Sequence, residues 1–134
     1  MDAPRRAVMS VLKIELVKEF SFNALHKLPY APAGDRSTRP HEHSFRVDVT
    51  VEGEVKPREQ TGELVDYGDI EQAMDPLLEN YLENGYLNQI DGLENPTSEN
   101  IARWIWGQLK NRLPGLKRVA LQETCTSSCH YEGQ

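Results

Sequence analysis

Basic residues are in the minority in this 134-residue sequence, which has 15 lysines and arginines against 21 aspartates and glutamates. The formal net charge is −6 and no basic stripe is present, so the composition disfavours nucleic-acid binding. Long apolar runs are also missing, so no segment is expected to span a membrane. Only two cysteines occur, Cys125 and Cys129, and these do not make a disulfide framework. With His130 they form a weak metal pattern, and half-buried strand thiols are the favoured interpretation. We therefore predict a cytoplasmic protein.

The length and the composition predict a single domain with a hydrophobic core. Hydrophobic residues make up 38% of the sequence and charged residues 27%, as in ordinary globular proteins. Residues 1–12 are interpreted as an N-terminal leader, and residues 13–134 as the folded domain.

The clearest pattern is an alternation of polar and apolar residues between His41 and Glu52. Every odd position from Phe45 to Val51 is apolar, which is typical of a half-buried strand. His41 and His43 share the parity of these apolar residues, and an earlier alternating run ends in His26. Because side chains of one parity project from one face, we expect three histidines together at the rim of the core.

Two helices and two further strands are predicted after these strands. The first helix is expected to start near Asp69, capped by Asp66 or Asp69, with a kink or a slight break at Pro76. The second is expected to start after its cap, Thr97. Strands are expected over residues 117–124 and 129–132. The order β-β-α-α-β-β predicts an α+β protein whose antiparallel sheet carries both helices on one face. The other sheet face is polar, so it faces solvent or lines the wet interior of an oligomer.

The histidines and one glutamate are the candidate site residues. Three imidazoles with a fourth position open are the pattern of a catalytic zinc site, whereas histidines hydrogen-bonded at a core edge are the simpler alternative. Glu123 continues the apolar face of its strand, where a carboxylate is costly unless it is paired. It either holds an N–H pair of a ligand or pairs with a lysine or arginine.

Six short segments, spread over roughly residues 13–132, carry a resemblance to a known family. They are Phe20–His26, His41–Phe45, Val65–Asp69, Leu87–Asn88, Asn95–Asn100 and Glu123–Thr124. Together they resemble the 6-pyruvoyl-tetrahydropterin synthase family, whose bacterial branch makes 6-carboxy-5,6,7,8-tetrahydropterin for queuosine and other 7-deazapurines.

The resemblance implies a T-fold domain over residues 13–134. Such subunits join edge to edge into a trimeric barrel, and two trimers stack into a homohexamer whose tunnel is lined by the polar sheet face. The resemblance also implies zinc on His26, His41 and His43, and a small-molecule pterin bound by Glu123 and Thr124. These expectations agree with the parity of the histidines and of Glu123.

The sequence departs from this family at the residues that move protons. Ser37 stands where the family has a cysteine base, Glu83 and Asn84 stand where it has an Asp-His pair, and Glu42 replaces a glycine. A serine hydroxyl is a weaker base than a thiolate, and an asparagine does not titrate. Two functions follow as alternatives. One is a zinc-dependent lyase acting on 7,8-dihydroneopterin triphosphate or a related pterin, with Ser37 and Glu83 at the altered catalytic positions. The other is a non-catalytic or divergent pterin-binding hexamer that keeps the metal and ligand pocket.

Overall fold

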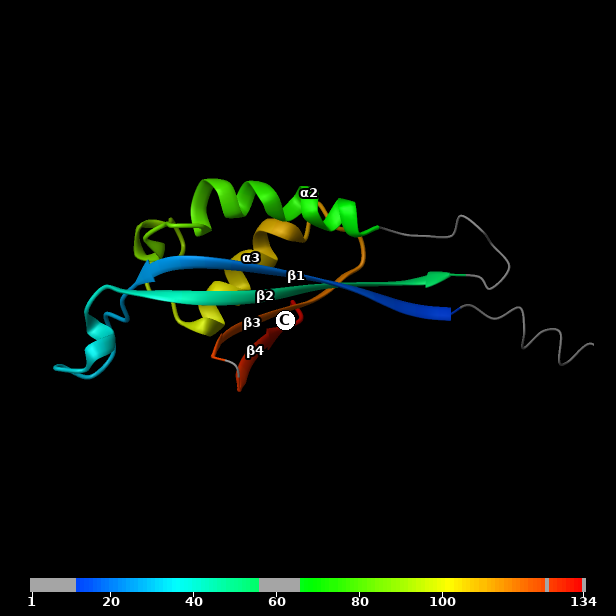
Figure 1. The fold of residues 1–134 in the computed structure, drawn as a ribbon. Coiled ribbons are helices and arrows are strands. Elements are labelled where there is room, and N and C mark those ends of the chain that lie inside the picture. Colours follow the sequence, from blue (N-terminus) through cyan, green and yellow to red (C-terminus); the bar gives the residue numbers. More distant parts are fainter. Residues whose placement is uncertain (1–11, 56–65, 125, 134) are drawn as a thin grey trace, which may run out of the picture.

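The computed structural model describes residues 12–55, 66–124 and 126–133. Four strands form one antiparallel sheet in the order β1-β2-β3-β4, and two α-helices cover one of its faces (Figure 1). The elements are β1 Leu12–His26, β2 His41–Val55, α2 Tyr67–Leu77, α3 Ser98–Leu109, β3 Leu116–Thr124 and β4 Ser127–Tyr131. The predicted α+β class and order of elements are confirmed. The last strand begins two residues earlier than residue 129.

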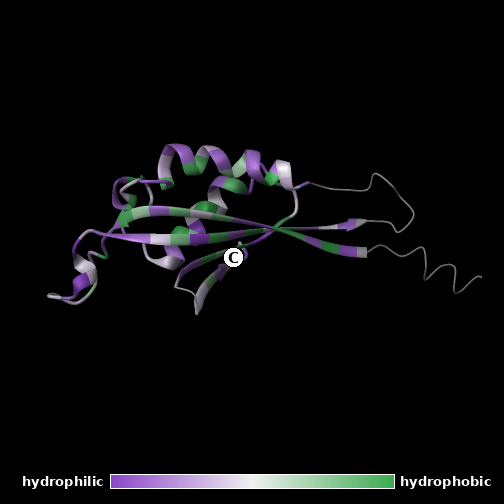
Figure 2. Cartoon of the chain, viewed as in Figure 1, coloured by the Kyte–Doolittle hydropathy of each residue, from purple (hydrophilic) through white to green (hydrophobic). Residues whose placement is uncertain are grey.

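The long β1–β2 ladder forms because polar and apolar residues alternate along both strands (Figure 2). The two strands pair without interruption from Leu12 opposite Val55 to His26 opposite His41. This register stacks the buried rings of Phe22 and Phe45, whose centroids lie 5.0 Å apart. Ile14 shares the inward parity but is 41% exposed, since β1 extends past α2 at that end (Figure 1).

The two helices begin at the caps that the sequence offers. Asp66 and Asp69 form a reciprocal capping box, so α2 begins at Tyr67, slightly before the predicted start. Pro76 lies inside α2 without interrupting it, and after Leu77 the helix continues as a π-helical segment, η2 (Leu78–Leu82). The Thr97 hydroxyl caps α3 as predicted, accepting a hydrogen bond from the Asn100 N–H.

Two loops meet at the histidine end of the sheet. The first, between β1 and β2, contains the short 3-10 helix η1 (Arg36–Thr38), and the second, after η2, contains η3 (Leu87–Gln89). Asn88 joins the second loop to the end of β1, because its side chain accepts from the Lys27 N–H and donates to the Lys27 carbonyl, both at 2.9 Å. The loop ahead of α3 is thereby held against the end of the strand that carries His26.

Residues 1–11 and 56–65 lie outside the described part of the chain. The leader predicted over residues 1–12 therefore stays a prediction, although Leu12 already belongs to β1. The turn predicted between β2 and α2 lies outside the described residues as well. None of the helices in the described ranges is long and apolar enough to cross a membrane.

Candidate functional site

Three histidines meet at one end of the β1–β2 ladder. His26 lies opposite His41 in the register, and His43 is on the same face two residues further along β2. The ring centroids are 4.5 Å apart for His26 and His41, 5.4 Å for His26 and His43, and 5.3 Å for His41 and His43. One ligand nitrogen from each ring lies within 4.8 Å of the other two. The structure thus brings together the three residues that the strand pattern predicts.

His26 is the most constrained of the three histidines. It is 1% exposed, and its Nδ1 lies 3.1 Å from the Pro96 carbonyl oxygen. Burial lowers its pKa, so the ring is neutral at pH 7 and Nδ1 carries the proton that the carbonyl accepts. The other nitrogen, Nε2, is buried and has no hydrogen-bond partner. A buried lone pair without a partner is costly, and coordination of a cation would satisfy it.

The other two rings complete a donor set that fits a divalent metal. His41 Nδ1 lies 2.8 Å from the Arg39 carbonyl oxygen, which leaves its Nε2 free to coordinate. His43 is half-buried, and its Nε2 lies 4.0 Å from Glu123 Oε2. Zinc in proteins is often bound by one imidazole nitrogen while the other nitrogen of the same ring donates a hydrogen bond to a carbonyl oxygen. By this criterion the residues present fit such an ion.

Glu123 lies beside the histidines at the end of β3, with its side chain 24% exposed. Its Oε1 accepts a hydrogen bond from the Ser98 hydroxyl at 2.6 Å, at the first residue of α3. The sequence leaves open that Glu123 pairs with a lysine or arginine. Among the described residues it makes no such ion pair. Oε2 remains available for a ligand on the side that faces His43.

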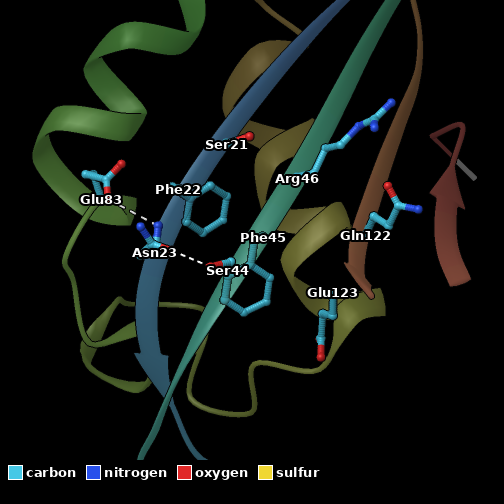
Figure 3. A pocket seen from close by; sticks show the side chains of 9 residues that line it. All are labelled: Ser21, Phe22, Asn23, Ser44, Phe45, Arg46, Glu83, Gln122 and Glu123. Carbon is cyan, nitrogen blue, oxygen red and sulfur yellow. Dashed lines mark hydrogen bonds between the residues drawn. The ribbon is translucent and has the colours of Figure 1, made fainter. Parts of the chain in front are cut away.

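A cavity of about 520 Å³ adjoins Glu123 and extends across the ends of three strands (Figure 3). Its lining is mostly polar and includes Asn23, Ser44, Arg46, Glu83, Gln122 and Glu123. Hydrogen bonds within this lining link Ser44 to Asn23, and the Asn23 N–H to Glu83 (Figure 3). A second cavity, of about 290 Å³, reaches Glu123 from the side of Ser98 and Cys129. Glu123 thus lies at the border of both cavities.

The two positions predicted to move protons have different partners. The Ser37 hydroxyl donates to Asp35 Oδ1 at 2.8 Å, and the Ser37 N–H donates to the same oxygen at 2.9 Å. Glu83 Oε1 instead accepts from the Asn23 N–H at 3.1 Å. In the described structure Ser37 and Glu83 share no hydrogen bond. Thr124 pairs with Ser127 in the sheet, and its side chain lies outside the described part.

Some residues of the site were missed by reasoning from the sequence. Asp35 could have been found from its spacing, because an aspartate two residues before a serine is typical of a cap or a tight turn. Ser98 lies in the motif that precedes α3, yet nothing local indicates that its hydroxyl reaches Glu123. The Pro96 carbonyl gives no signal at all, because every residue has a carbonyl and only the fold selects this one.

Cys129 lines the second cavity together with Glu123, but among the described residues it belongs to no group of metal-ligating side chains. Cys129 is a free, half-buried strand thiol, and burial raises its pKa, so it stays protonated at neutral pH. The neighbouring His130 contacts the Ser128 hydroxyl through Nε2. The favoured interpretation is confirmed for Cys129, whereas Cys125 lies outside the described residues.

An antiparallel four-stranded sheet, two helices on one face and a rim of three histidines define this protein as a member of the T-fold class. The family model for 6-pyruvoyl tetrahydropterin synthase matches residues 15–134, and the chain belongs to this family of pterin-converting enzymes.

Two relatives and one solved structure show the extent of the similarity. A 6-carboxy-5,6,7,8-tetrahydropterin synthase of Synechocystis sp. is 43% identical over 119 residues, which cover 87% of this chain and 91% of the relative. A dihydroneopterin monophosphate aldolase of Pyrococcus furiosus is 33% identical over 84% of this chain and 91% of its own length. The structure of the Caenorhabditis elegans 6-pyruvoyl tetrahydropterin synthase superposes with a TM-score of 0.76 at 24% identity, covering 94% of this chain and 98% of that one.

Proposed function

We propose that this protein is a zinc-dependent lyase that acts on 7,8-dihydroneopterin triphosphate or a closely related pterin. The observation that carries the proposal is the buried, unpartnered Nε2 of His26 in a group of three histidines whose ligand atoms lie within 4.8 Å of one another. The Glu123 carboxylate lies 4.0 Å from one of them, His43. The 43% identity to a 6-carboxy-5,6,7,8-tetrahydropterin synthase supports a pterin as the substrate.

His26, His41 and His43 would hold the zinc ion. When bound, zinc supplies Lewis-acid polarisation of an oxygen on the pterin side chain. The chain prepares its ligands in advance: the Pro96 and Arg39 carbonyls each accept a ring N–H, which selects the tautomer with a free Nε2 on His26 and on His41. Little reordering of these two rings would then accompany metal binding.

Glu123 would hold the pyrimidine edge of the pterin. Its two oxygens match a pair of N–H donors on a planar ring, and the Ser98 hydroxyl fixes the carboxylate in place. Thr124 follows it in the chain and would add a polar contact to the same edge. Because Glu123 lies next to His43, a pterin held by its ring would direct its side chain towards the histidines.

Assembly into a cytoplasmic homohexamer belongs to the same proposal. The described sheet has two outer strands, β1 and β4. The outer edge of β1 is bridged to Tyr86 at Leu25, and between residues 12 and 22 it pairs with no strand among the described residues. Val17, on this open part of β1, is apolar and yet 48% exposed. An open edge with apolar side chains favours pairing with another copy, and continued pairing around a symmetry axis closes a barrel.

A non-catalytic pterin-binding protein is the second candidate, favoured by the residues at the proton-transfer positions. The Ser37 hydroxyl is a weak base, and Asn84, in the left-handed region with φ of 59°, carries an amide that does not titrate. In this alternative the histidines and Glu123 bind metal and pterin, and the ligand leaves unchanged.

Mass spectrometry of the zinc-loaded protein with dihydroneopterin triphosphate separates the two candidates. Conversion of the side chain, absent after zinc is stripped, is the result expected of the lyase. Saturable binding of an unchanged ligand would establish the binding protein instead. Absence of both binding and conversion would refute the pterin assignment itself.

A further inference from the structure

We propose that Asp35 and Ser37 form a proton-relay pair, in which Ser37 takes a proton from the ligand's side chain as its own hydroxyl proton passes to Asp35. The inference rests on the proposed function, because it supplies a base for that lyase. Its basis is the hydrogen bond from Ser37 Oγ to Asp35 Oδ1, at 2.8 Å.

The direction of this hydrogen bond determines what Ser37 can do. A serine hydroxyl has one proton and two acceptor lone pairs, and a carboxylate can only accept. The Ser37 hydroxyl proton is therefore donated to Asp35, and Oγ keeps its lone pairs as acceptors. A ligand group that meets Ser37 must then be a donor, such as a hydroxyl on the pterin side chain.

Two hydrogen bonds to backbone carbonyls hold the loop of this pair at the histidine end of the sheet. The Leu28 N–H donates to the Ser37 carbonyl at 2.7 Å, and Leu28 follows His26 by two residues. On the other side, Arg39 follows Ser37 by two residues and its carbonyl accepts from His41. The loop that carries the pair is thus joined to the segments of two of the three histidines.

The proton balance closes within the pair. As the O–H bond of a ligand hydroxyl breaks, its electron pair stays on the ligand oxygen, and its proton forms a new O–H bond with a lone pair of Ser37 Oγ. The original Oγ–H bond breaks and leaves its electron pair on Oγ, and that proton forms an O–H bond on Asp35 Oδ1. The ligand oxygen thus takes the negative charge that Asp35 loses. Ser37 is neutral before and after, so no alkoxide forms on Ser37 and the high pKa of a free serine is not an obstacle. Asp35 changes from carboxylate to carboxylic acid, and no oxidant or reductant is needed.

The relay is expected to be slow. The two hydrogen bonds from Ser37, first from its backbone N–H and then from its hydroxyl, lower the pKa of Asp35 below its ordinary value. Asp35 is therefore ionised at neutral pH and ready to accept a proton, but it is a weaker base than the thiolate typical of the family.

A cap for η1 is the competing role for Asp35, since the Ser37 N–H also donates to it. The Asp35→Asn variant separates the two roles. Asparagine caps as well as aspartate does, so the loop is retained, but an amide oxygen cannot take the proton. Asp75→Asn on the exposed face of α2 is the matched control, because Asp75 makes no side-chain contact among the described residues.

The first test measures single-turnover conversion of dihydroneopterin triphosphate together with the Kd for neopterin. Asp35→Asn and Ser37→Ala should each slow conversion at least about 30-fold, with Kd unchanged within about threefold. The double variant should be no slower than either single variant, because the two residues act in one step. Asp35→Glu should restore part of the rate, and Asp75→Asn should have the wild-type rate.

The second test needs no turnover. In a Ser37→Cys variant, alkylation measured against pH and localised by peptide mass spectrometry reports the thiol pKa at position 37. A neighbouring carboxylate should raise that pKa above the ordinary value of about 8.5, and adding Asp35→Asn should lower it by about one unit or more. An unchanged thiol pKa would show that the carboxylate does not act on this position.

Three results would overturn the relay. The first is an Asp35→Asn variant that converts the triphosphate at the wild-type rate. The second is a Glu83→Gln variant that loses conversion while Asp35→Asn stays active, which would place the base at Glu83. The third is wild-type protein that binds neopterin but never converts the triphosphate, which ends the relay and leaves pterin binding intact. Failure to bind neopterin at all would instead end the proposed function.

Discussion

Replacing Glu123 with alanine should weaken pterin binding by about 2–4 kcal/mol, which is roughly a 30- to 800-fold increase in Kd. A hydrogen bond to a charged group contributes about 1.5–3 kcal/mol, so two N–H donors on one carboxylate set an upper range near 3–6 kcal/mol. Two features of the structure reduce this value. The side chain is 24% exposed, and one oxygen already accepts from Ser98.

Isothermal titration with neopterin, which lacks the triphosphate, measures this loss without interference from turnover. Glu123→Gln should fall between wild type and Glu123→Ala, because the amide keeps an oxygen acceptor but loses the charge. Glu79→Ala is the control for charge, since Glu79 is exposed on η2 and makes no side-chain contact among the described residues. Ser37→Ala should also bind neopterin normally, because Ser37 would meet only the reacting side chain.

A Kd in Glu123→Ala that stays within about threefold of wild type, in a variant with an unchanged circular-dichroism spectrum, would refute the reasoning. The pterin ring would then be held elsewhere, and the carboxylate beside His43 would need another role. A comparable loss in Glu79→Ala would attribute the effect to net charge instead of to the contact.

Further predictions concern the metal, the assembly and the altered catalytic positions. Purified protein should hold about one zinc per chain, and elemental analysis should find that His41→Ala/His43→Ala has lost it; undiminished zinc would contradict the three-histidine site. Light scattering should give the mass of a hexamer, whereas a stable monomer at micromolar concentration would contradict the barrel. Wild-type turnover of dihydroneopterin triphosphate should be low, with partial recovery in Ser37→Cys/Glu83→Asp/Asn84→His; an ordinary enzymatic rate in wild type would show that these three positions do not limit the reaction.

The sequence by itself determined the sheet, its inward face and the meeting of the histidines. Strand alternation has a period of two, so His41 and His43 share a face whatever the rest of the chain does. The antiparallel return of β2 along β1 then places His26 opposite His41. Helix starts could also be predicted, because the caps Asp66 and Thr97 act on N–H groups only three residues away.

Only the tertiary structure decided which partners these side chains have. Pro96 is 70 residues from His26 in the chain, and its carbonyl reaches the ring because Asn88 holds the intervening loop against β1. Ser98 reaches Glu123 because α3 packs over β3. A local pattern specifies the direction of a side chain, whereas a hydrogen bond requires two groups to meet at about 3 Å, which depends on every element between them.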